Sequence, residues 1–396
     1  MYRDRLRISA HIADIHIGVH TITAEEIKYQ LYERFIKPLS ELAILDLITV
    51  NGDVSHLSLS FNSKLAEVYI WFFDSIVSIA KKKNAAIIVV QGTLSHEYDQ
   101  LDNVKVYQSS VEMYFASEPM VVETKGMRIY CLPDIHIKNK EDESKLYSFP
   151  DGHFDMVLGH GSITETQFIK QESEHAISKN IVYESKQLVR ICKGPILFGH
   201  IHSPMKFLGR IFYINSFTRY IHGEEADKGW MLTAYIPETA QFIAERVIND
   251  LAFNFNIFTV SHQLFDKLDA DELVKKIDKF VKEYKVDRLC LELNYMATDA
   301  NIAKIQILRN YYSRDKHVNK LKIKALSKKE AQLIEQNERQ IEENKKSYLT
   351  DKSLTFEEKL QRFIEEEYNV KVPISKLHTV FTSDDLLIRE GVSSVR

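Results

Sequence analysis

Four short motifs in the first half of the chain combine aspartate, histidine and glycine. They read DIHIG from Asp14, GDVSH from Gly52, GHG from Gly159 and GHIH from Gly199. Carboxylate and imidazole ligands without cysteine suit hard to borderline divalent ions such as manganese or magnesium, while zinc and iron stay open on ligand type. The motifs therefore predict a metal site built from distant parts of the chain.

The candidate ligands are too many for one ion. They comprise two aspartates and four histidines, with two spare histidines: Asp14, Asp53, His16, His160, His200, His202, and the spare His56 and His96. Two ions about 3.5–4 Å apart, bridged by a carboxylate, would use these groups and would clamp the attacking and leaving oxygens of a phosphoester. The predicted chemistry is phosphoester hydrolysis.

Short apolar runs indicate the strands that must position these residues. Such runs occur at 8–13 and around Ile48, Val89, Tyr130, Val157 and Leu197. Between them, apolar residues recur at helical spacing in 25–42 and 64–83. Alternating strands and helices predict a layered α/β domain, and ligands of such sheets bind beyond the carboxyl ends of the strands. The metal-capable residues follow the apolar runs and fit that rule.

Three regions are expected, because 396 residues exceed one ordinary core. Residues 1–250 carry the layered domain, and 251–326 read as a smaller α/β module. Residues 327–396 begin with a highly charged stretch and continue with a narrow apolar stripe at helical spacing. We expect a C-terminal helical region there.

The four motifs, in their order and spacing, resemble the signature of the calcineurin-like metallophosphoesterases. His56 three residues after Asp53, the later stretch NSFTRY...GEEADKGW and the domain layout resemble, more narrowly, the nuclease subunit of the bacterial SbcCD and phage recombination complexes. That subunit is homologous to the eukaryotic meiotic-recombination nuclease. The resemblance implies a layered metallophosphoesterase sandwich and a metal-dependent DNA nuclease, exonuclease or endonuclease, of an ATP-regulated recombination and repair complex.

The resemblance also implies a role for each motif residue. The first ion would be held by Asp14, His16 and His202, the second by His160 and His200, and Asp53 would bridge the two. Manganese is the expected ion, with magnesium as the alternative. His56 resembles the residue that positions the substrate, and His96 the one that polarises the phosphate or protonates the leaving oxygen. Ordinary loop histidines are the alternative for both.

One motif departs from the family pattern. The family has Gly-Asn-His-Asp after the third strand, with the asparagine on the second ion, and this chain has QGTLSHEYDQ. Either Thr93 or Ser95 stands in for the asparagine, and we favour Ser95 because it directly precedes His96. Glu97 would then take the place of the aspartate. A neutral hydroxyl is a weaker ligand than an amide carbonyl, so the second ion would be held less tightly.

The tetrapeptide DIHI occurs a second time, at 134–137. It follows Pro133 and leads into the charged stretch KNKEDESK, and its position matches no family ligand. We therefore interpret Asp134 and His136 as a loop pair that leads into a solvated charged loop, rather than as metal ligands.

Contacts with DNA and with a partner protein are expected in the last two regions. In KLKIKAL, Lys320, Lys322 and Lys324 alternate with apolar residues, so a strand there would present a basic face to phosphates; solvation of an exposed strand is the alternative. The later stripe includes Phe356, Leu360 and Phe363. Its alternatives are packing within its own domain and docking on a partner. The resemblance implies a coiled-coil ABC-type ATPase as that partner, and a homodimer within a heterotetramer.

Composition narrows the setting. The net charge of −4 gives no global attraction to nucleic acid, so DNA contact must come from a local basic face. Three widely spaced cysteines argue against a disulfide framework. No apolar run is long enough for a membrane span or a secretory signal, so we expect a cytoplasmic protein, in the host cytoplasm if phage-encoded, without membrane contact.

Two other functions stay open on the sequence. One is a phosphatase or small phosphodiester hydrolase of the same superfamily, although such an enzyme would not need the long region after the metal motifs. The other is a scaffold that binds DNA and its partner but has lost the chemistry through the altered third motif.

Overall fold

The computed structural model describes residues 6–60, 62–97, 100–135, 149–150, 152–166, 182–224, 226–313, 315, 317–327, 329–332, 334, 358–359 and 361–362. The chain divides into two compact units. The first comprises Met1–Thr259, Ala270–Glu292 and Leu308–Lys322, and the second comprises Val260–Asp269, Leu293–Ile307 and Ile323–Arg396. These bounds differ from the three expected regions, whose boundaries stay predictions.

Two six-stranded sheets form the centre of the first unit. The first sheet has the order β14-β13-β1-β2-β3-β4, with bounds β1 Arg7–Ile12, β2 Leu47–Asn51, β3 Ala86–Val90, β4 Met113–Ala116, β13 Gly229–Ile236 and β14 Gln241–Ile248. The second has the order β11-β12-β10-β7-β6-β5, with bounds β5 Met120–Thr124, β6 Met127–Leu132, β7 Met156–His160, β10 Ile196–Gly199, β11 Met205–Phe207 and β12 Ile211–Tyr213. A two-stranded pair joins β8 Ser162–Ile163 to β9 Val182–Tyr183.

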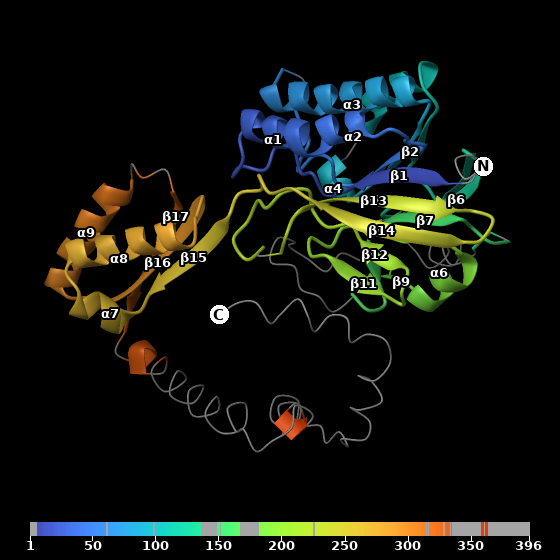
Figure 1. Ribbon diagram of the computed structural model, residues 1–396. Helices are drawn as coiled ribbons and strands as arrows, with labels where there is room; N and C mark the ends of the chain where they lie inside the picture. The colour runs from blue at the N-terminus through green and yellow to red at the C-terminus, as the bar shows by residue number, and fades with distance from the viewer. Residues whose placement is uncertain are drawn as a thin grey trace. The chain divides into compact units, whose positions relative to one another are not determined.

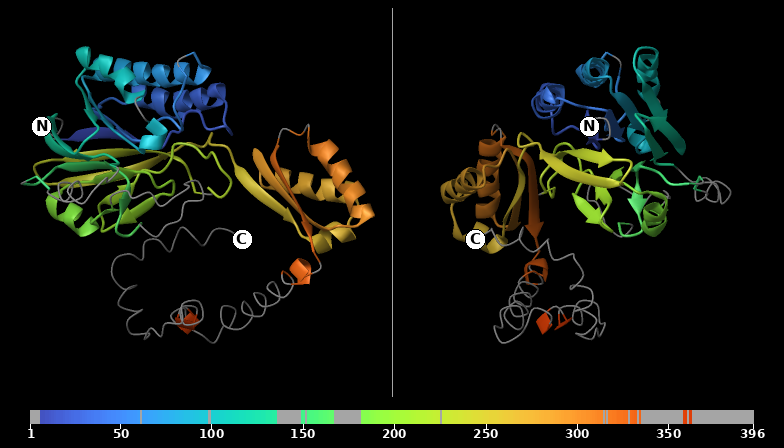
Figure 2. Two further views of the ribbon diagram at one scale, coloured as in Figure 1. Left: turned by 180° about the vertical axis from the view of Figure 1, so that it is seen from behind. Right: turned by 45° about the vertical axis from the view of Figure 1, so that its right-hand side comes forward.

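The helices of this unit cover the outer faces of the two sheets, as Figures 1 and 2 show. Their bounds are α1 Ala24–Leu31, η1 Tyr32–Ile36, α2 Lys37–Glu41, α3 Lys64–Lys83, α4 Leu94–Glu97, η2 Gln100–Ser109 and α6 Ser185–Ile191. Three clusters of buried apolar side chains lie between neighbouring layers. One joins helices such as α3 to the first sheet, one lies between the sheets, and one joins the second sheet to α6. The predicted layered α/β architecture is confirmed.

Helix α3 illustrates how the sequence specifies an outer layer. Ser63 caps its start by accepting a hydrogen bond from the backbone N–H of Ala66, and Asn84 ends it in a left-handed conformation. Glu67 lies in its first turn and three lysines in its last, which suits the helix dipole. Its buried side chains, including Phe72 and Ile76, pack against the sheet. The predicted helix at 64–83 is confirmed.

The register of the parallel strands brings the motif loops together. β1 pairs in parallel with β2, and β2 with β3, so that Ile12 lies opposite Val50 and Asn51 opposite Val90. In the second sheet β10 pairs in parallel with β7, with Gly199 opposite His160. β2, β3 and β7 are buried along their whole length, as expected of parallel strands covered on both faces. The carboxyl ends of both sheets therefore carry the motifs.

A third sheet follows, in the order β15-β16-β17, with bounds Phe255–Val260, Arg288–Met296 and Val318–Leu326. The helices of this part of the chain are α7 His262–Lys267, α8 Ala270–Glu283 and α9 Asp299–Tyr312. In β17 the lysines are exposed while Leu321 and Ile323 are half-buried, as the alternating pattern predicts. No helix among the described residues is long and apolar enough to cross a membrane. All three cysteines are buried and free.

A fully buried histidine in β1 makes the stability depend on pH. Thr49 donates its hydroxyl proton to Asn51, so it accepts the Nδ1–H of His11 at 2.7 Å, and Nε2 of His11 accepts the hydroxyl of Thr233 at 2.8 Å. Burial lowers the pKa of His11 from 6.5 to about 3. Below pH 6.5 His11 is protonated in the unfolded chain but stays neutral in the folded protein. The free energy of unfolding therefore decreases as the pH is lowered from 6.5 to about 3.

We expect this histidine alone to remove about 2 kcal/mol of stability between pH 7 and pH 5. The measurement is urea unfolding of the native protein and of His11→Gln at both pH values. Other buried histidines titrate equally in both proteins, so the difference between the two pH dependences isolates His11. Equal pH dependences would contradict the assignment.

Candidate metal centre

The backbone at the candidate ligands is unusual. Asp14, His16, Asp53 and His200 all have positive φ, at 49°, 51°, 54° and 87°. Few residues other than glycine adopt this region, and such conformations concentrate at functional sites. Each of these residues lies just after a strand, where the chain turns sharply and directs a ligating group toward the carboxyl ends of the sheets.

The first group consists of Asp14, His16 and His202, whose ligand atoms all lie within 4.8 Å of one another. The Nε2 atoms of His16 and His202 are 3.2 Å apart, and Nε2 of His202 is 3.7 Å from Oδ1 of Asp14. Both Asp14 carboxylate oxygens also accept the backbone N–H of His200, at 2.9 and 3.0 Å. This contact ties the first sheet to the second.

The second group consists of Asp53, His160 and His200, again within 4.8 Å. Nε2 of His160 lies 3.2 Å from Oδ2 of Asp53. The Nδ1–H of His160 donates to the carbonyl of Asn51 at 2.8 Å, which fixes the tautomer that turns Nε2 toward Asp53. Oδ2 of Asp53 is also 3.9 Å from Nε2 of His16, so Asp53 lies between the two groups.

The electrostatics of this centre favour a bound cation. Burial alone would raise the pKa of Asp53, but His160 and His16 beside it lower that pKa below its ordinary range. Burial likewise opposes charge on His160, but the Asp53 carboxylate raises the pKa of His160 well above 6.5. Without a metal ion, a proton supplies the positive charge that these carboxylates need. The buried oxygen and nitrogen ligands therefore fit two divalent ions, and binding those ions would release a proton.

Two glycines of the motifs allow this close packing. A Cβ added to Gly52 would lie 2.2 Å from Nδ1 of His160, and the φ of Gly52 is +81°. A Cβ on Gly92 would lie 2.3 Å from the backbone nitrogen of Asp53. Only glycine allows the loops after β2 and β3 to approach this closely.

Thr93, and not Ser95, lies beside the second group. The backbone N–H of Thr93 donates to Oδ1 of Asp53 at 2.6 Å, and its hydroxyl lies 3.2 Å from Oδ2 of Asp53 and 3.5 Å from Nε2 of His160. Ser95 lies in α4 with an exposed side chain. The preference for Ser95 is therefore not supported by the geometry, because the chain turns into a helix at Leu94 and carries Ser95 outward.

We expect Thr93→Asn to tighten binding of the second ion about tenfold, or ~1.4 kcal/mol. An amide carbonyl at this position would replace a weaker hydroxyl ligand. Calorimetric titration of the metal-free protein with manganese measures the change. Ser95→Asn is the matched control and should leave both affinities unchanged; tighter binding in that variant instead would return the ligand position to Ser95.

The two spare histidines lie against the first group. Nδ1 of His56 is 3.4 Å from Nδ1 of His16, and the rings of His56 and His96 stack with centroids 5.2 Å apart. The Nδ1–H of His96 donates to the carbonyl of His56. Burial and the neighbouring His96 lower the pKa of His56 to about 4. Both side chains are half-buried, which leaves them accessible to a substrate.

Three residues behind His202 escaped the sequence interpretation. Glu224 accepts the Nδ1–H of His202 at 2.8 Å, and the hydroxyl of Tyr220 lies 3.0 Å from Nε2 of His202. The ammonium of Lys228 is buried and donates to the carbonyl of His202 at 2.7 Å and to Ser216 at 2.8 Å. A carboxylate on the far nitrogen orients a ligating histidine toward its ion. Within GEEADKGW, the spacing of Glu224 and Lys228 was the available signal.

Asp134 of the second DIHI is buried, although a highly charged stretch follows it in the sequence. Its side chain is 7% exposed, and its backbone N–H donates to the carbonyl of Gln91 at 3.1 Å, beyond the end of β3. Burial raises the pKa of Asp134 to about 7, against the opposing influence of His160 and a hydrogen bond with Thr93. The carboxyl group thus borders the second metal group. His136 lies outside the described residues.

Glu97 connects the loops after β2 and β3. It is 1% exposed and accepts the backbone N–H groups of Val54 at 2.9 Å and Gly92 at 2.7 Å. Burial raises the pKa of Glu97 to about 7, and Asp53 acts in the same direction. The side chain therefore supports the loops that carry Asp53 and Thr93.

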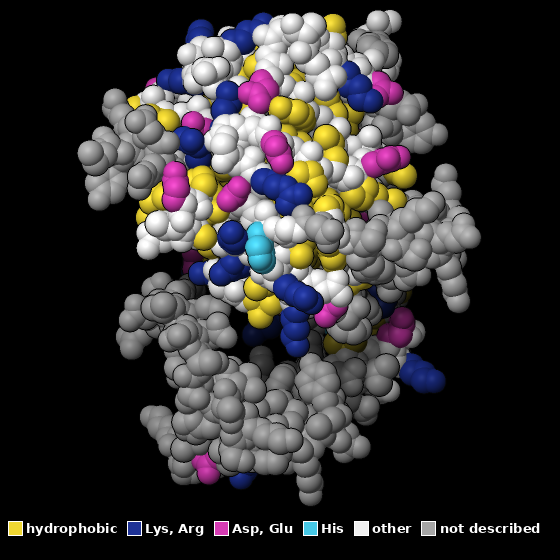
Figure 3. All heavy atoms as spheres, turned by 90° about the vertical axis from the view of Figure 1, so that its right-hand side faces the viewer, with side chains coloured by type: hydrophobic (Ala, Val, Ile, Leu, Met, Phe, Trp, Pro, Cys, Tyr) yellow, Lys and Arg dark blue, Asp and Glu magenta, His cyan; other side chains and the backbone are white. Residues whose placement is uncertain are grey.

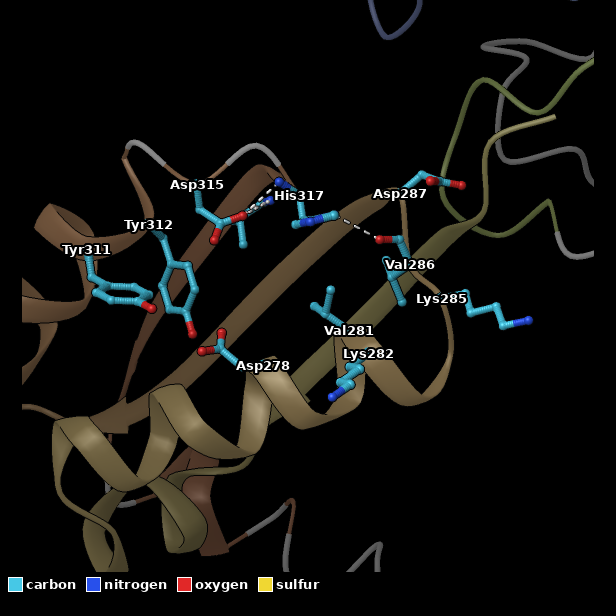
Figure 4. A pocket seen from close by; sticks show the side chains of 11 residues that line it. Asp278, Val281, Lys282, Lys285, Val286, Asp287, Tyr311, Tyr312, Asp315 and His317 are labelled. Atoms are coloured by element: carbon cyan, nitrogen blue, oxygen red, sulfur yellow. Dashed lines mark hydrogen bonds between the residues drawn. The ribbon is translucent and has the colours of Figure 1, made fainter. Parts of the chain in front are cut away.

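A separate cavity of about 510 Å³ lies between α8 and the start of β17 (Figure 4). Its walls include Asp278, Tyr312, Asp315 and His317. Asp315 accepts the backbone N–H of His317 at 2.7 Å, and the Nδ1–H of His317 donates to the carbonyl of Val286 at 3.0 Å. These contacts stabilise the local turn, and the residues lining the cavity include none of the predicted metal ligands.

The remaining predicted site residues lie on β17 or outside the residues that the structure describes. Lys320, Lys322 and Lys324 are exposed on β17; Lys322 pairs with Glu292 at 2.7 Å. The predicted partner-binding residues Phe356, Leu360 and Phe363 lie outside the described residues.

No protein-family model matches the chain, and no curated protein matches it. The solved structures that match this chain include an archaeal phosphodiesterase. It is 10% identical in sequence, with a TM-score of 0.27, and the match covers 60% of this chain and 99% of that one. They also include GAP50, the anchor in the inner membrane complex of Plasmodium, which is 9% identical with a TM-score of 0.32 over 62% of this chain and 89% of that one. Both TM-scores are low, so the chemistry rests on the residues of this chain.

Proposed function

We propose that this chain is a two-metal phosphodiesterase of the calcineurin-like type, and that its substrate is DNA. The observation that carries the hydrolytic part is the convergence of two buried metal groups around Asp53, whose Oδ2 lies 3.2 Å from His160 and 3.9 Å from His16. Asp14, His16 and His202 would hold one ion and His160 and His200 the other, with Asp53 between them. Manganese is the proposed ion, with magnesium as the alternative.

Two divalent ions at this centre would activate water and neutralise charge on the phosphate. The chain itself orients the ligands through the Asn51 carbonyl on His160 and the Glu224 carboxylate on His202. His96 is held by its Nδ1–H donating to the carbonyl of His56, so its Nε2 is the atom that can assist the leaving oxygen. His56 would position the phosphodiester.

A cavity of the first unit supports an anionic substrate. It has a volume of about 720 Å³, and its lining includes His56, Tyr220, His222, Lys320 and Lys322. Two lysines beside a catalytic histidine can neutralise phosphates flanking the scissile bond without reading bases. Figure 3 shows acidic and basic side chains intermingled over one face of the molecule, where charges of opposite sign offset each other.

The partners remain proposals from the resemblance. We propose that the region at 327–396 binds a coiled-coil ABC-type ATPase, which would supply the ATP dependence of a recombination or repair complex. Two copies of the chain would pair through the first helices. The exposed side chains of Tyr29, Tyr32 and Ile70 on these helices support such a contact.

One assay separates this proposal from its competitors. Purified protein with manganese is incubated with linear duplex DNA and with a generic phosphodiester, with and without the ATPase partner. Cleavage of DNA supports the nuclease, whereas cleavage of the generic ester alone supports a small phosphodiester hydrolase. Failure to cleave either, with DNA and partner binding retained, supports the scaffold.

We expect Lys320→Ala with Lys322→Ala to weaken DNA binding equally on all sequences. Loss of two phosphate contacts should make the slope of log affinity against log salt concentration shallower by about 1.8. Binding is measured by fluorescence anisotropy over a salt series. Lys275→Ala, an exposed lysine on α8, is the matched control; an equal change in that variant would show that only overall charge matters.

A further inference from the structure

Three histidines form a third group of possible metal ligands, next to the two metal groups that would hold the proposed ions. His16, His56 and His96 each offer a nitrogen within 4.8 Å of the other two, and the group contains imidazoles alone. His16 is buried, while His56 and His96 are half-buried. The ring of His16 meets that of His96 edge-on with centroids 4.9 Å apart. An ion from solvent could reach the group through the two half-buried rings.

The nitrogen positions suit a small ion that prefers nitrogen. Nδ1 of His56 lies 3.4 Å from Nδ1 of His16. Two imidazole nitrogens on one tetrahedral zinc ion, each about 2.0–2.1 Å from it, are separated by roughly 3.3 Å. The Nδ1–H of His96 is used by the carbonyl of His56, which leaves Nε2 of His96 as its ligand atom.

We infer that His16, His56 and His96 form a third metal site that takes zinc. Three imidazoles with one open position are a common donor set for zinc. Manganese and magnesium prefer oxygen ligands, and zinc binds nitrogen sites more tightly than manganese does. The third site therefore differs in ion preference from the centre built around Asp14 and Asp53.

His16 belongs to both the third site and the first metal group. Its Nε2 lies 3.2 Å from Nε2 of His202, and its Nδ1 faces His56. A neutral imidazole has one nitrogen lone pair, because the other nitrogen carries the proton. His16 can therefore ligate the first ion through Nε2 or zinc through Nδ1, and while it keeps its proton it cannot do both.

Zinc in the third site is therefore inhibitory, a consequence that rests on the proposed function, whereas zinc binding itself does not. The ion withdraws His16 from the first metal and occupies the nitrogen atoms of His56 and His96. Hydrolysis stops without any change in Asp53, His160 or His200.

The first experiment measures zinc binding to the metal-free full-length protein by competition with a chromophoric chelator. We expect His56→Gln to weaken one zinc equivalent by about tenfold or more. The matched control is His20→Gln, an exposed neighbour outside the group, which should bind like the native protein. Equal zinc number and affinity in the native protein and His56→Gln would overturn the site.

The second experiment adds zinc to manganese-loaded protein and follows released manganese by electron paramagnetic resonance. We expect one manganese ion released per zinc bound in the native protein and in His20→Gln, and no release at the same zinc concentration in His56→Gln. Release that persists in His56→Gln would mean direct replacement at the two-ion centre, and would overturn the shared use of His16.

The activity measurement separates this inference from the proposed function. Zinc added in the presence of excess manganese should suppress phosphodiester hydrolysis by the native protein and by His20→Gln. If the protein hydrolyses no phosphodiester, the chelator and manganese-release results still decide the third site. If it is active and zinc binding depends on His56 while hydrolysis continues unchanged, the inhibitory role is overturned.

Discussion

Asp53→Asn is expected to lower kcat/KM for phosphodiester hydrolysis on the order of a thousandfold or more, a loss of about 4 kcal/mol of transition-state stabilisation. Asp53 faces both metal groups, with Oδ2 at 3.2 Å from Nε2 of His160 and 3.9 Å from Nε2 of His16. The amide keeps the size of the side chain but removes the negative charge. Both ions would then lose a ligand, and the second would keep only histidines and a neutral hydroxyl.

The same substitution changes the metal-free protein in a predictable direction. The Asp53 carboxylate is the main influence raising the pKa of His160, so His160 should become neutral at a lower pH in Asp53→Asn. The measurements are steady-state hydrolysis, manganese stoichiometry by calorimetry, and thermal unfolding to show that the fold is intact. Asp227→Asn, which removes an exposed carboxylate, is the control. A variant that retained two tightly bound ions would contradict the bridging role.

The strands and the ligands at their ends were predictable because both depend on local pattern. β2 and β3 are short, mainly apolar strands, and Asp53 follows the last residue of β2 by two positions. Parallel register then brings the carboxyl ends together without any further information. Helix α3 was equally clear, since its capping residue and its apolar spacing agree.

The residues that the sequence interpretation missed owe their positions to long-range contacts. The choice between Thr93 and Ser95 depended on where α4 begins, which adjacency to His96 could not reveal. Asp134 precedes a charged stretch, yet it is buried because it follows β6, which lies beside β7, and because its backbone N–H donates to the carbonyl of Gln91, which follows β3 in the other sheet. No local pattern carries that information.

The His202 environment shows the same limit. Glu224 and Lys228 are charged residues in a polar stretch, and composition alone does not indicate that they are buried. Both are instead buried or nearly so. The Lys228 ammonium donates to the His202 carbonyl and the Ser216 hydroxyl, and the Glu224 carboxylate accepts the Nδ1–H of His202. Burial of a charge is tolerated only where such partners exist.

His96→Gln is expected to lower kcat on DNA by roughly a hundredfold to ten-thousandfold while both manganese ions stay bound. His96 belongs neither to the first nor to the second metal group. Its loss therefore removes proton transfer or polarisation of the phosphate rather than a ligand of either manganese ion. Glutamine keeps a polar side chain of similar length at this position, which limits any rearrangement of the loop. Single-turnover cleavage of duplex DNA and calorimetric manganese titration measure the two effects.

Substrates with different leaving groups distinguish the two possible roles of His96, proton transfer to the leaving oxygen and polarisation of the phosphate. A sugar alkoxide needs a proton as the P–O bond breaks, whereas a nitrophenolate leaves readily without one. If His96 is the general acid, the loss in His96→Gln should be smaller by about tenfold or more on bis(4-nitrophenyl) phosphate than on DNA. An equal loss on both substrates would instead assign His96 to polarising the phosphate, because that interaction is independent of the departing oxygen. Its position against His16, with ring centroids 4.9 Å apart, places it close enough to the first metal group for either role.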